Sequence, residues 1–158
     1  MPSRFCYDYP RPAVTVDMVV FTKTEDELRV LLIKRKHDPF AGKWAIPGGF
    51  LEIEEPLEEG ARRELKEETG LEISGPIEQL GVFGEPGRDP RGRTISIAYA
   101  GLAVPRESTI QGGDDAQLAE WFDPLDPPEL AFDHREILAV GLAWYRGRSE
   151  LKAARKNQ

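Results

Sequence analysis

The hydrophobic residues in the first third of the chain fall in short runs that predict β-strands. Residues 13–21 (AVTVDMVVF) and 28–35 (LRVLLIKR) are rich in β-branched and aliphatic side chains, and the polar turn 24–27 separates them. This pattern predicts two buried strands joined as a hairpin, with one polar residue, Asp17, inside the first. A short strand is expected at 44–46, where the sequence Pro47-Gly48-Gly49 should end it.

The middle of the chain has the patterns of further strands. Residues 71–73 are interpreted as a short strand. Residues 93–104 alternate between apolar and small polar side chains and should pair with 77–83, forming a long hairpin around the Gly- and Pro-rich loop 84–92. Residues 118–122 (LAEWF) predict another strand.

The C-terminal part has helical spacing. Asp133 is the expected N-cap of the last helix, and His134 beside it is interpreted as structural rather than catalytic. The chain from Arg146 onwards is basic and is expected to fray. The apolar stripe of this helix is formed by Ile137, Leu138, Gly141, Leu142 and Tyr145.

A second helix is predicted from Pro56 to about Thr69. Proline suits the first helical turn, because its missing N–H would have no partner there. Gly70 is a natural left-handed cap at the end of the helix. The residues that recur every fourth position and define the face turned to the core are Leu57, Ala61 and Leu65.

Acidic residues lie on the apolar side of this helix. Glu64 and Glu68 project about 20° either side of Leu57, and Glu67 lies about 80° round. Crowded carboxylates on a half-buried face repel one another and resist desolvation, and a divalent cation would relieve both effects. Oxygen ligands without Cys or His indicate Mg²⁺ or Mn²⁺, and Mg²⁺ sites often include substrate phosphates. The alternative, a solvated charge-rich helix, is disfavoured because these acids lie on the wrong face.

The same stretch resembles the Nudix box, G-x5-E-x7-R-E-U-x-E-E-x-G-U with U an aliphatic residue. All nine fixed positions are filled, by Gly49, Glu55, Arg63, Glu64, Leu65, Glu67, Glu68, Gly70 and Leu71. The resemblance implies an α+β fold, a Nudix-like α/β/α sandwich with a mixed sheet. It divides the chain into an N-terminal arm, 1–12, and a single Nudix hydrolase domain, 13–158.

The resemblance also implies roles for the box residues. Glu64, Glu67 and Glu68 would hold Mg²⁺ (or Mn²⁺) and carry catalysis, and the backbone carbonyl of Gly48 would join the metal shell. Arg63 would orient a ligand through paired hydrogen bonds. Glu55 would stabilise the helix start or add a ligand. The family often supplies a further acid from a later loop. Asp115 is the predicted base, although the sequence alone does not distinguish it from Asp114 and Glu120.

The loop after the box resembles the ADP-ribose pyrophosphatase branch of the family. Pro86 falls fifteen residues past the last box position, and GRDPRG occupies residues 87–92. Arg88, Asp89 and Arg91 are therefore predicted to bind substrate, which would be ADP-ribose cleaved to AMP and ribose 5-phosphate. The alternatives are NADH-type dinucleotides or nucleoside triphosphates, an ADP-ribose-sensing regulator without its DNA-binding module, and a merely solvated hairpin tip.

Composition narrows the function classes further. The 158 residues include 28 acids and 21 bases, and the net charge of −7 argues against a nucleic-acid partner. One cysteine, Cys6, rules out an internal disulfide and fits the cytoplasm. The N-terminus has no apolar run typical of a signal peptide, and no stretch approaches ~18 apolar residues, so no membrane association is expected. A homodimer is an open alternative, because the arm carries three aromatic residues, Phe5, Tyr7 and Tyr9.

Overall fold

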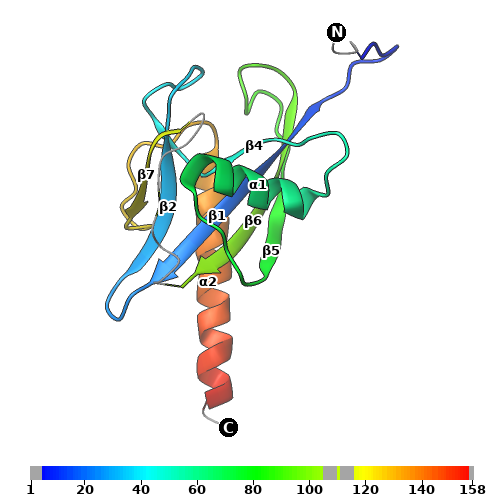
Figure 1. The fold of residues 1–158 in the computed structure, drawn as a ribbon. Coiled ribbons are helices and arrows are strands. Elements are labelled where there is room, and N and C mark those ends of the chain that lie inside the picture. Colours follow the sequence, from blue (N-terminus) through cyan, green and yellow to red (C-terminus); the bar gives the residue numbers. More distant parts are fainter. Residues whose placement is uncertain (1–4, 105–109, 111–115, 157–158) are drawn as a thin grey trace.

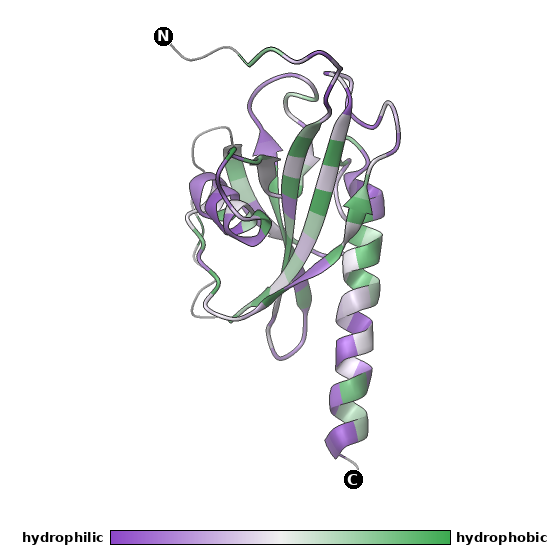
Figure 2. Ribbon diagram, turned by 90° about the vertical axis from the view of Figure 1, so that its right-hand side faces the viewer, coloured by the Kyte–Doolittle hydropathy of each residue, from purple (hydrophilic) through white to green (hydrophobic). Residues whose placement is uncertain are grey.

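The computed structural model describes residues 5–104, 110 and 116–156, in which helices cover both faces of one β-sheet (Figure 1). Helix α1 (Leu57–Thr69) lies on one face and α2 (His134–Lys156) on the other, as the side view in Figure 2 shows. The strands are β1 (Ala13–Lys23), β2 (Leu28–Arg35), β3 (Trp44–Ala45), β4 (Gly48–Phe50), β5 (Ile77–Phe83), β6 (Thr94–Ala103) and β7 (Ala116–Phe122).

The sheet is mixed. Its order among the described strands is β3-β2-β1-β6-β5, with β4 also pairing with β1 and β7 with β2. The hairpins β1–β2 and β5–β6 are antiparallel, as predicted. The central pair β1–β6 is parallel, from Ala13 opposite Thr94 to Thr22 opposite Ala103. This long-range pairing places the middle of β1 between helix layers on both sides.

Two hydrophobic cores lie on the two faces of β1. Val16 and Met18 belong to the core that includes α1, and Val19 and Phe21 belong to the core that includes α2. Burial on both faces explains why the sequence of this strand is almost continuously apolar. Because successive side chains alternate between faces, Asp17 is directed to the α2 side.

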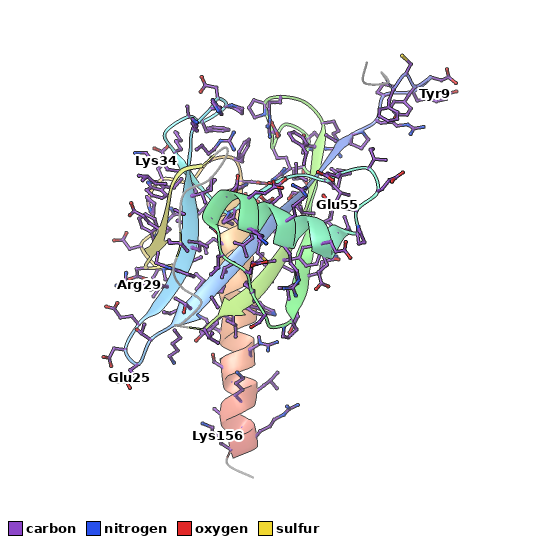
Figure 3. All side chains as sticks on the ribbon, in the orientation of Figure 1. Tyr9, Glu25, Arg29, Lys34, Glu55 and Lys156 are labelled. Carbon is purple, nitrogen blue, oxygen red and sulfur yellow. The ribbon has the colours of Figure 1, made fainter. Side chains whose placement is uncertain are left out.

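Two local predictions are wrong, and one strand was not predicted. Residues 71–73 form no strand; Leu71 and Ile73 are instead buried in the core that includes α1. Strand β3 ends before Pro47, as predicted, but a further strand that the sequence did not predict, β4, follows at once at Gly48–Phe50. The predicted fraying from Arg146 is also wrong, since α2 continues to Lys156, the end labelled in Figure 3. Once a helix is nucleated, each added residue gains a hydrogen bond, so an anchored helix can extend past its core contacts.

The predicted start of α2 is confirmed, because the helix begins at His134 directly after Asp133. Within the described ranges, no helix is long and apolar enough to cross a bilayer.

Candidate active site

Helix α1 carries the acids of the motif along the edge of a buried interface. Pro56 has an extended backbone and precedes the first turn, and Gly70 closes the helix with a left-handed φ of 71°. Ala61 and Leu65 are fully buried against the sheet. The helical spacing then turns Glu68 inward, and only 7% of this residue is exposed. The structure thus confirms the predicted helix, its glycine cap and its core-facing side, but Pro56 is the N-cap and not part of the first turn.

Glu68 is a buried carboxylate held against strand β4. Its Oε2 accepts a hydrogen bond from the backbone N–H of Gly48 at 3.0 Å. Burial raises the pKa of Glu68 to about 8, and the nearby carboxylates of Glu64 and Asp17 act in the same direction. Burial also raises the pKa of Glu64. Both acids therefore lie where positive charge would favour their ionised forms.

Strand β4 passes close to β1 and to helix α1 at its two glycines. A Cβ atom on Gly48 would lie 2.3 Å from the backbone oxygen of Val16 on β1, and one on Gly49 would lie 2.5 Å from the carboxyl carbon of Glu64. A larger residue at position 48 would push β4 away from β1, and one at position 49 would displace the Glu64 side chain. The two glycines therefore bring a peptide backbone directly against the carboxylates.

Arg63 gathers three acids around its guanidinium group. It binds Glu55 through two bonds, Nη2 to Oε1 at 2.6 Å and Nε to Oε2 at 2.9 Å. Its Nη1 donates to Glu64 at 2.8 Å and to Glu67 at 3.0 Å. The hydrogen bonds from Arg63 hold the pKa of Glu55 at about 2. Figure 3 shows Glu55 beside the start of α1, so Arg63 links the loop before the helix to the helix itself.

The loop between β5 and β6 contains two arginines, each of which pairs with an aspartate. Arg88 forms a bidentate pair with Asp133, with distances of 2.8 and 2.6 Å, and its side chain is only 4% exposed. Arg91 pairs with Asp89 at 2.7 Å through Nη2, and the backbone N–H of Arg91 also donates to Asp89. Burial alone would raise the pKa of Asp89, but the hydrogen bonds from Arg91 outweigh it and lower that pKa. Asp133 therefore uses its carboxylate to hold this loop.

Two aromatic rings flank Arg91. Its guanidinium carbon lies 4.8 Å from the ring centroid of Phe50 and 5.5 Å from that of Phe132. Such contacts, together with the pair to Asp89, limit the rotamers that Arg91 can adopt. Arg91 is therefore held in one orientation beside strand β4.

A cavity of ≈ 270 Å³ connects these features. It is lined by Glu64 and Glu68 from α1, by the backbone of Gly48 and Gly49, and by Arg91. Glu67, with 42% of its side chain exposed, joins the group through Arg63. The structure thus brings most of the predicted site residues of the box together with one arginine of the later loop.

The other predicted site residues do not line this cavity. Arg88 and Asp89 line a smaller neighbouring cavity of ≈ 40 Å³, which Glu68, Gly48 and Arg91 also line. Asp114 and Asp115 are outside the described residues. Glu120 is exposed on β7 opposite Leu32.

Sequence reasoning missed other residues of the site. Arg35, His37 and Phe50 line the larger cavity. Phe132, which contacts Arg91, has the unusual φ of 53° and precedes α2. None of these residues has a local spacing that indicates a site, because their meeting depends on the fold.

The donor atoms at the cavity fit a hard divalent cation. In the part of the chain that the structure describes, no group of three or more His, Cys, Asp or Glu side chains is arranged to hold a metal. Arg63 engages Glu64 and Glu67, and the N–H of Gly48 engages Glu68. Two carboxylates and a peptide oxygen are nevertheless a suitable partial shell for Mg²⁺ or Mn²⁺, since Mg²⁺ usually keeps several waters.

Comparisons of this chain with known proteins agree on one family. Residues 11–141 match the family model of the NUDIX domain. The chain is similar to ADP-ribose pyrophosphatase of Methanocaldococcus jannaschii, with 46% identity over 139 residues that cover 88% of this chain and 78% of that protein. It is also similar to the ADPR responsive transcriptional repressor NtrR of Acinetobacter baylyi, with 36% identity over 140 residues. That match covers 86% of this chain but 55% of the repressor.

Among solved structures, the NUDIX domain of Shewanella oneidensis NrtR complexed with ADP ribose has the same fold. The TM-score is 0.78 at 32% identity, and the match covers 92% of this chain and 94% of that one. The predicted Nudix-like sandwich with a mixed sheet is thereby confirmed. The chain belongs to the Nudix family of pyrophosphohydrolases, the family whose box its sequence resembles.

Proposed function

We propose that this protein hydrolyses the diphosphate bond of ADP-ribose to give AMP and ribose 5-phosphate, with Mg²⁺ or Mn²⁺ as its cofactor. The observation that carries the proposal is the cavity shared by Glu64, Glu68, Gly48 and Arg91, which places two carboxylates and a peptide backbone beside a guanidinium group. The similarity to an ADP-ribose pyrophosphatase and to a domain crystallised with ADP ribose supports this substrate.

The box residues would form the metal-binding part of the site. Glu64, Glu67 and Glu68, with the carbonyl of Gly48, would hold the cation. When bound, the cation supplies Lewis-acid stabilisation of diphosphate oxygens and a more acidic water. Arg63 orients Glu64 and Glu67 through its hydrogen bonds.

The reaction is a hydrolysis at one phosphorus. The oxygen of the attacking water forms a bond to that phosphorus, and the bond to the bridging oxygen breaks, so that each product carries a phosphate monoester. The water proton passes to a carboxylate base. We assign Asp115 to this role, with Asp114 and Glu120 as the alternatives.

The loop of residues 87–92 would bind the substrate. Arg91 lines the cavity of the box acids, and its guanidinium group is suited to a phosphate or a ribose hydroxyl. Asp89 would orient Arg91, while Arg88, buried against Asp133, would support the loop from behind. Of the three residues predicted to bind substrate, we therefore assign the direct contact to Arg91.

A substrate panel tests the proposal. ADP-ribose, NADH and several nucleoside triphosphates are incubated at matched concentrations of Mg²⁺ and of Mn²⁺, and the products are separated. We expect the highest kcat/KM with ADP-ribose and equal amounts of AMP and ribose 5-phosphate. A preference for triphosphates or NADH would instead support the other Nudix substrates.

An ADP-ribose-sensing role is the second candidate, favoured by the similarity to the repressor NtrR. The chain spans 55% of that repressor's length, so its whole activity does not transfer. With a net charge of −7, we expect no binding to duplex DNA at ~150 mM salt. Sequence-specific binding tighter than about micromolar in a shift assay would support the regulator. The homodimer and the cytoplasmic location stay predictions.

A further inference from the structure

A buried polar cluster lies between β1 and α2 and lines the small cavity beside the box acids. Asp17, on β1, is 5% exposed, and Ser96 on β6 donates a hydrogen bond to its Oδ2. His134, at the start of α2, is also 5% exposed, and its Nε2 lies 3.7 Å from Oδ1 of Asp17. Burying a polar side chain lowers stability unless the side chain is well paired. The contacts of these residues therefore indicate what they hold in place.

The hydrogen bonds of His134 define its tautomer. Its Nδ1 accepts a hydrogen bond from the backbone N–H of Ile46 at 2.9 Å. An accepting Nδ1 carries no proton, so the neutral ring carries its proton on Nε2, the atom that faces Asp17. The imidazole therefore lies between Asp17, which its Nε2 faces at 3.7 Å, and the backbone of Ile46, to which it is hydrogen-bonded.

Ile46 leads directly into the backbone that meets the box acids. Pro47 accepts a hydrogen bond from the N–H of Met18 at 2.8 Å, and Gly48 pairs with Asp17 in the register of β4 on β1. The N–H of Gly48 then donates to Glu68. The 46–48 segment is thus held by β1 and by His134, and its end positions Glu68.

We propose that His134 is a positioning residue that, oriented by Asp17, holds the 46–48 backbone so that the Gly48 carbonyl and Glu68 face the same cation. The inference rests on the proposed function only in taking Gly48 and Glu68 as metal ligands. It gives α2, which lies on the opposite face of the sheet from α1, an indirect part in metal binding.

Two amide substitutions separate the two contacts of His134. The side-chain amide of His134→Asn reaches the place of Nδ1 and can still accept from Ile46. The longer side chain of His134→Gln reaches the place of Nε2 instead and leaves the N–H of Ile46 without its acceptor. Thr22→Val is the matched control, because it removes a buried hydrogen bond from Thr22 Oγ1 to the carbonyl of Ala103 at the far end of β1.

The measurement is Mn²⁺ binding by electron paramagnetic resonance, without substrate, alongside Tm in chelator. We expect His134→Gln to bind Mn²⁺ about 10- to 100-fold more weakly than the wild type, the loss typical of residues that orient metal ligands. His134→Asn should bind nearly as tightly as the wild type. Thr22→Val should lower Tm while leaving Mn²⁺ affinity unchanged.

Other outcomes would overturn the inference. Equal affinities of the Asn and Gln variants would show that the acceptor for Ile46 does not matter, and weaker binding by Thr22→Val would show a general effect of destabilisation. A wild-type protein that does not bind Mn²⁺ would also refute it. Normal Mn²⁺ binding without hydrolysis of ADP-ribose would contradict the proposed function alone, whereas an active His134→Gln enzyme with unchanged Mn²⁺ affinity would contradict the inference alone.

Discussion

Two arginines organise carboxylates in this protein, and they do so in opposite ways. Arg63 shares its guanidinium group among Glu55, Glu64 and Glu67, and 24% of its side chain is exposed. Arg88 forms one bidentate pair with Asp133, and 4% of its side chain is exposed. The partners of Arg63 lie within eight residues of it, whereas Asp133 lies 45 residues from Arg88.

The difference in exposure separates ion pairs that can change partner from an ion pair that stays fixed. Partly exposed ion pairs contribute little stability, so acids that share Arg63 can change partner when a cation arrives. A buried pair is different, because removal of one member leaves an uncompensated charge in the protein interior. The Arg63 group therefore suits a binding site, and the pair of Arg88 and Asp133 suits support of the neighbouring loop.

The largest effect is expected when the buried pair is broken. Asp133→Ala should lower the free energy of unfolding by about 3–5 kcal/mol, because it strands Arg88. Glu58→Ala, which removes an exposed i,i+4 pair with Arg62, should lower it by only about 0.3–0.5 kcal/mol. Urea denaturation measures both values. Similar losses in the two variants would show that burial does not set the contribution of these ion pairs to stability.

The two acids that line the cavity, Glu64 and Glu68, should affect activity rather than stability. Glu64→Gln and Glu68→Gln should each lower kcat by roughly a hundred- to a thousand-fold, the loss typical when electrostatic stabilisation of a transition state is removed. In chelator their Tm should be equal to or higher than that of the wild type, because like charges no longer repel. Glu59→Gln on the same helix is the control. A large fall in Tm for either variant in chelator would indicate a structural role instead.

Substitution of Arg91 tests whether the loop that Arg88 holds in place determines substrate specificity. Arg91→Ala should lower kcat/KM for ADP-ribose by roughly ten- to a hundred-fold, or about 1.5–3 kcal/mol, and Arg91→Lys should not restore the bidentate contact. The loss should be small for nucleoside triphosphates, which lack the terminal sugar. Arg93→Ala, an exposed arginine at the end of the same loop, is the control. Equal losses on all substrates would show that Arg91 does not determine specificity.

The smallest effect concerns pH. Arg63 holds the pKa of Glu55 at about 2, below the ordinary value of 4.5. A lowered folded-state pKa means that this contribution to stability is complete above pH 4.5 and is lost as the pH falls towards 2. Glu55→Gln should therefore flatten the dependence of the free energy of unfolding on pH between those values. Acid titration followed by circular dichroism compares it with Glu59→Gln, and identical slopes would mean that the Glu55 pair contributes nothing.

Errors of the sequence-based prediction came from segments whose partners are distant. Leu71 and Ile73 alternate like a strand, but their burial comes from packing in the core that includes α1, without strand pairing. Gly48 and Gly49 have low strand propensity, yet β1 supplies their pairing partners, and the close approach of the β1 backbone and of the Glu64 carboxylate favours their small size. Tertiary contacts overrode local preference in both cases.

The sequence by itself determined helix α1, its glycine cap and the face that carries Glu64 and Glu68, because helical geometry converts spacing into direction over a few residues. It also determined the two hairpins and the family. Only the tertiary structure decided that Arg88 pairs with Asp133 and that His134 lies between Asp17 and Ile46. These contacts depend on the parallel pairing of β1 with β6 and on the position of α2 across the sheet, which no local period encodes.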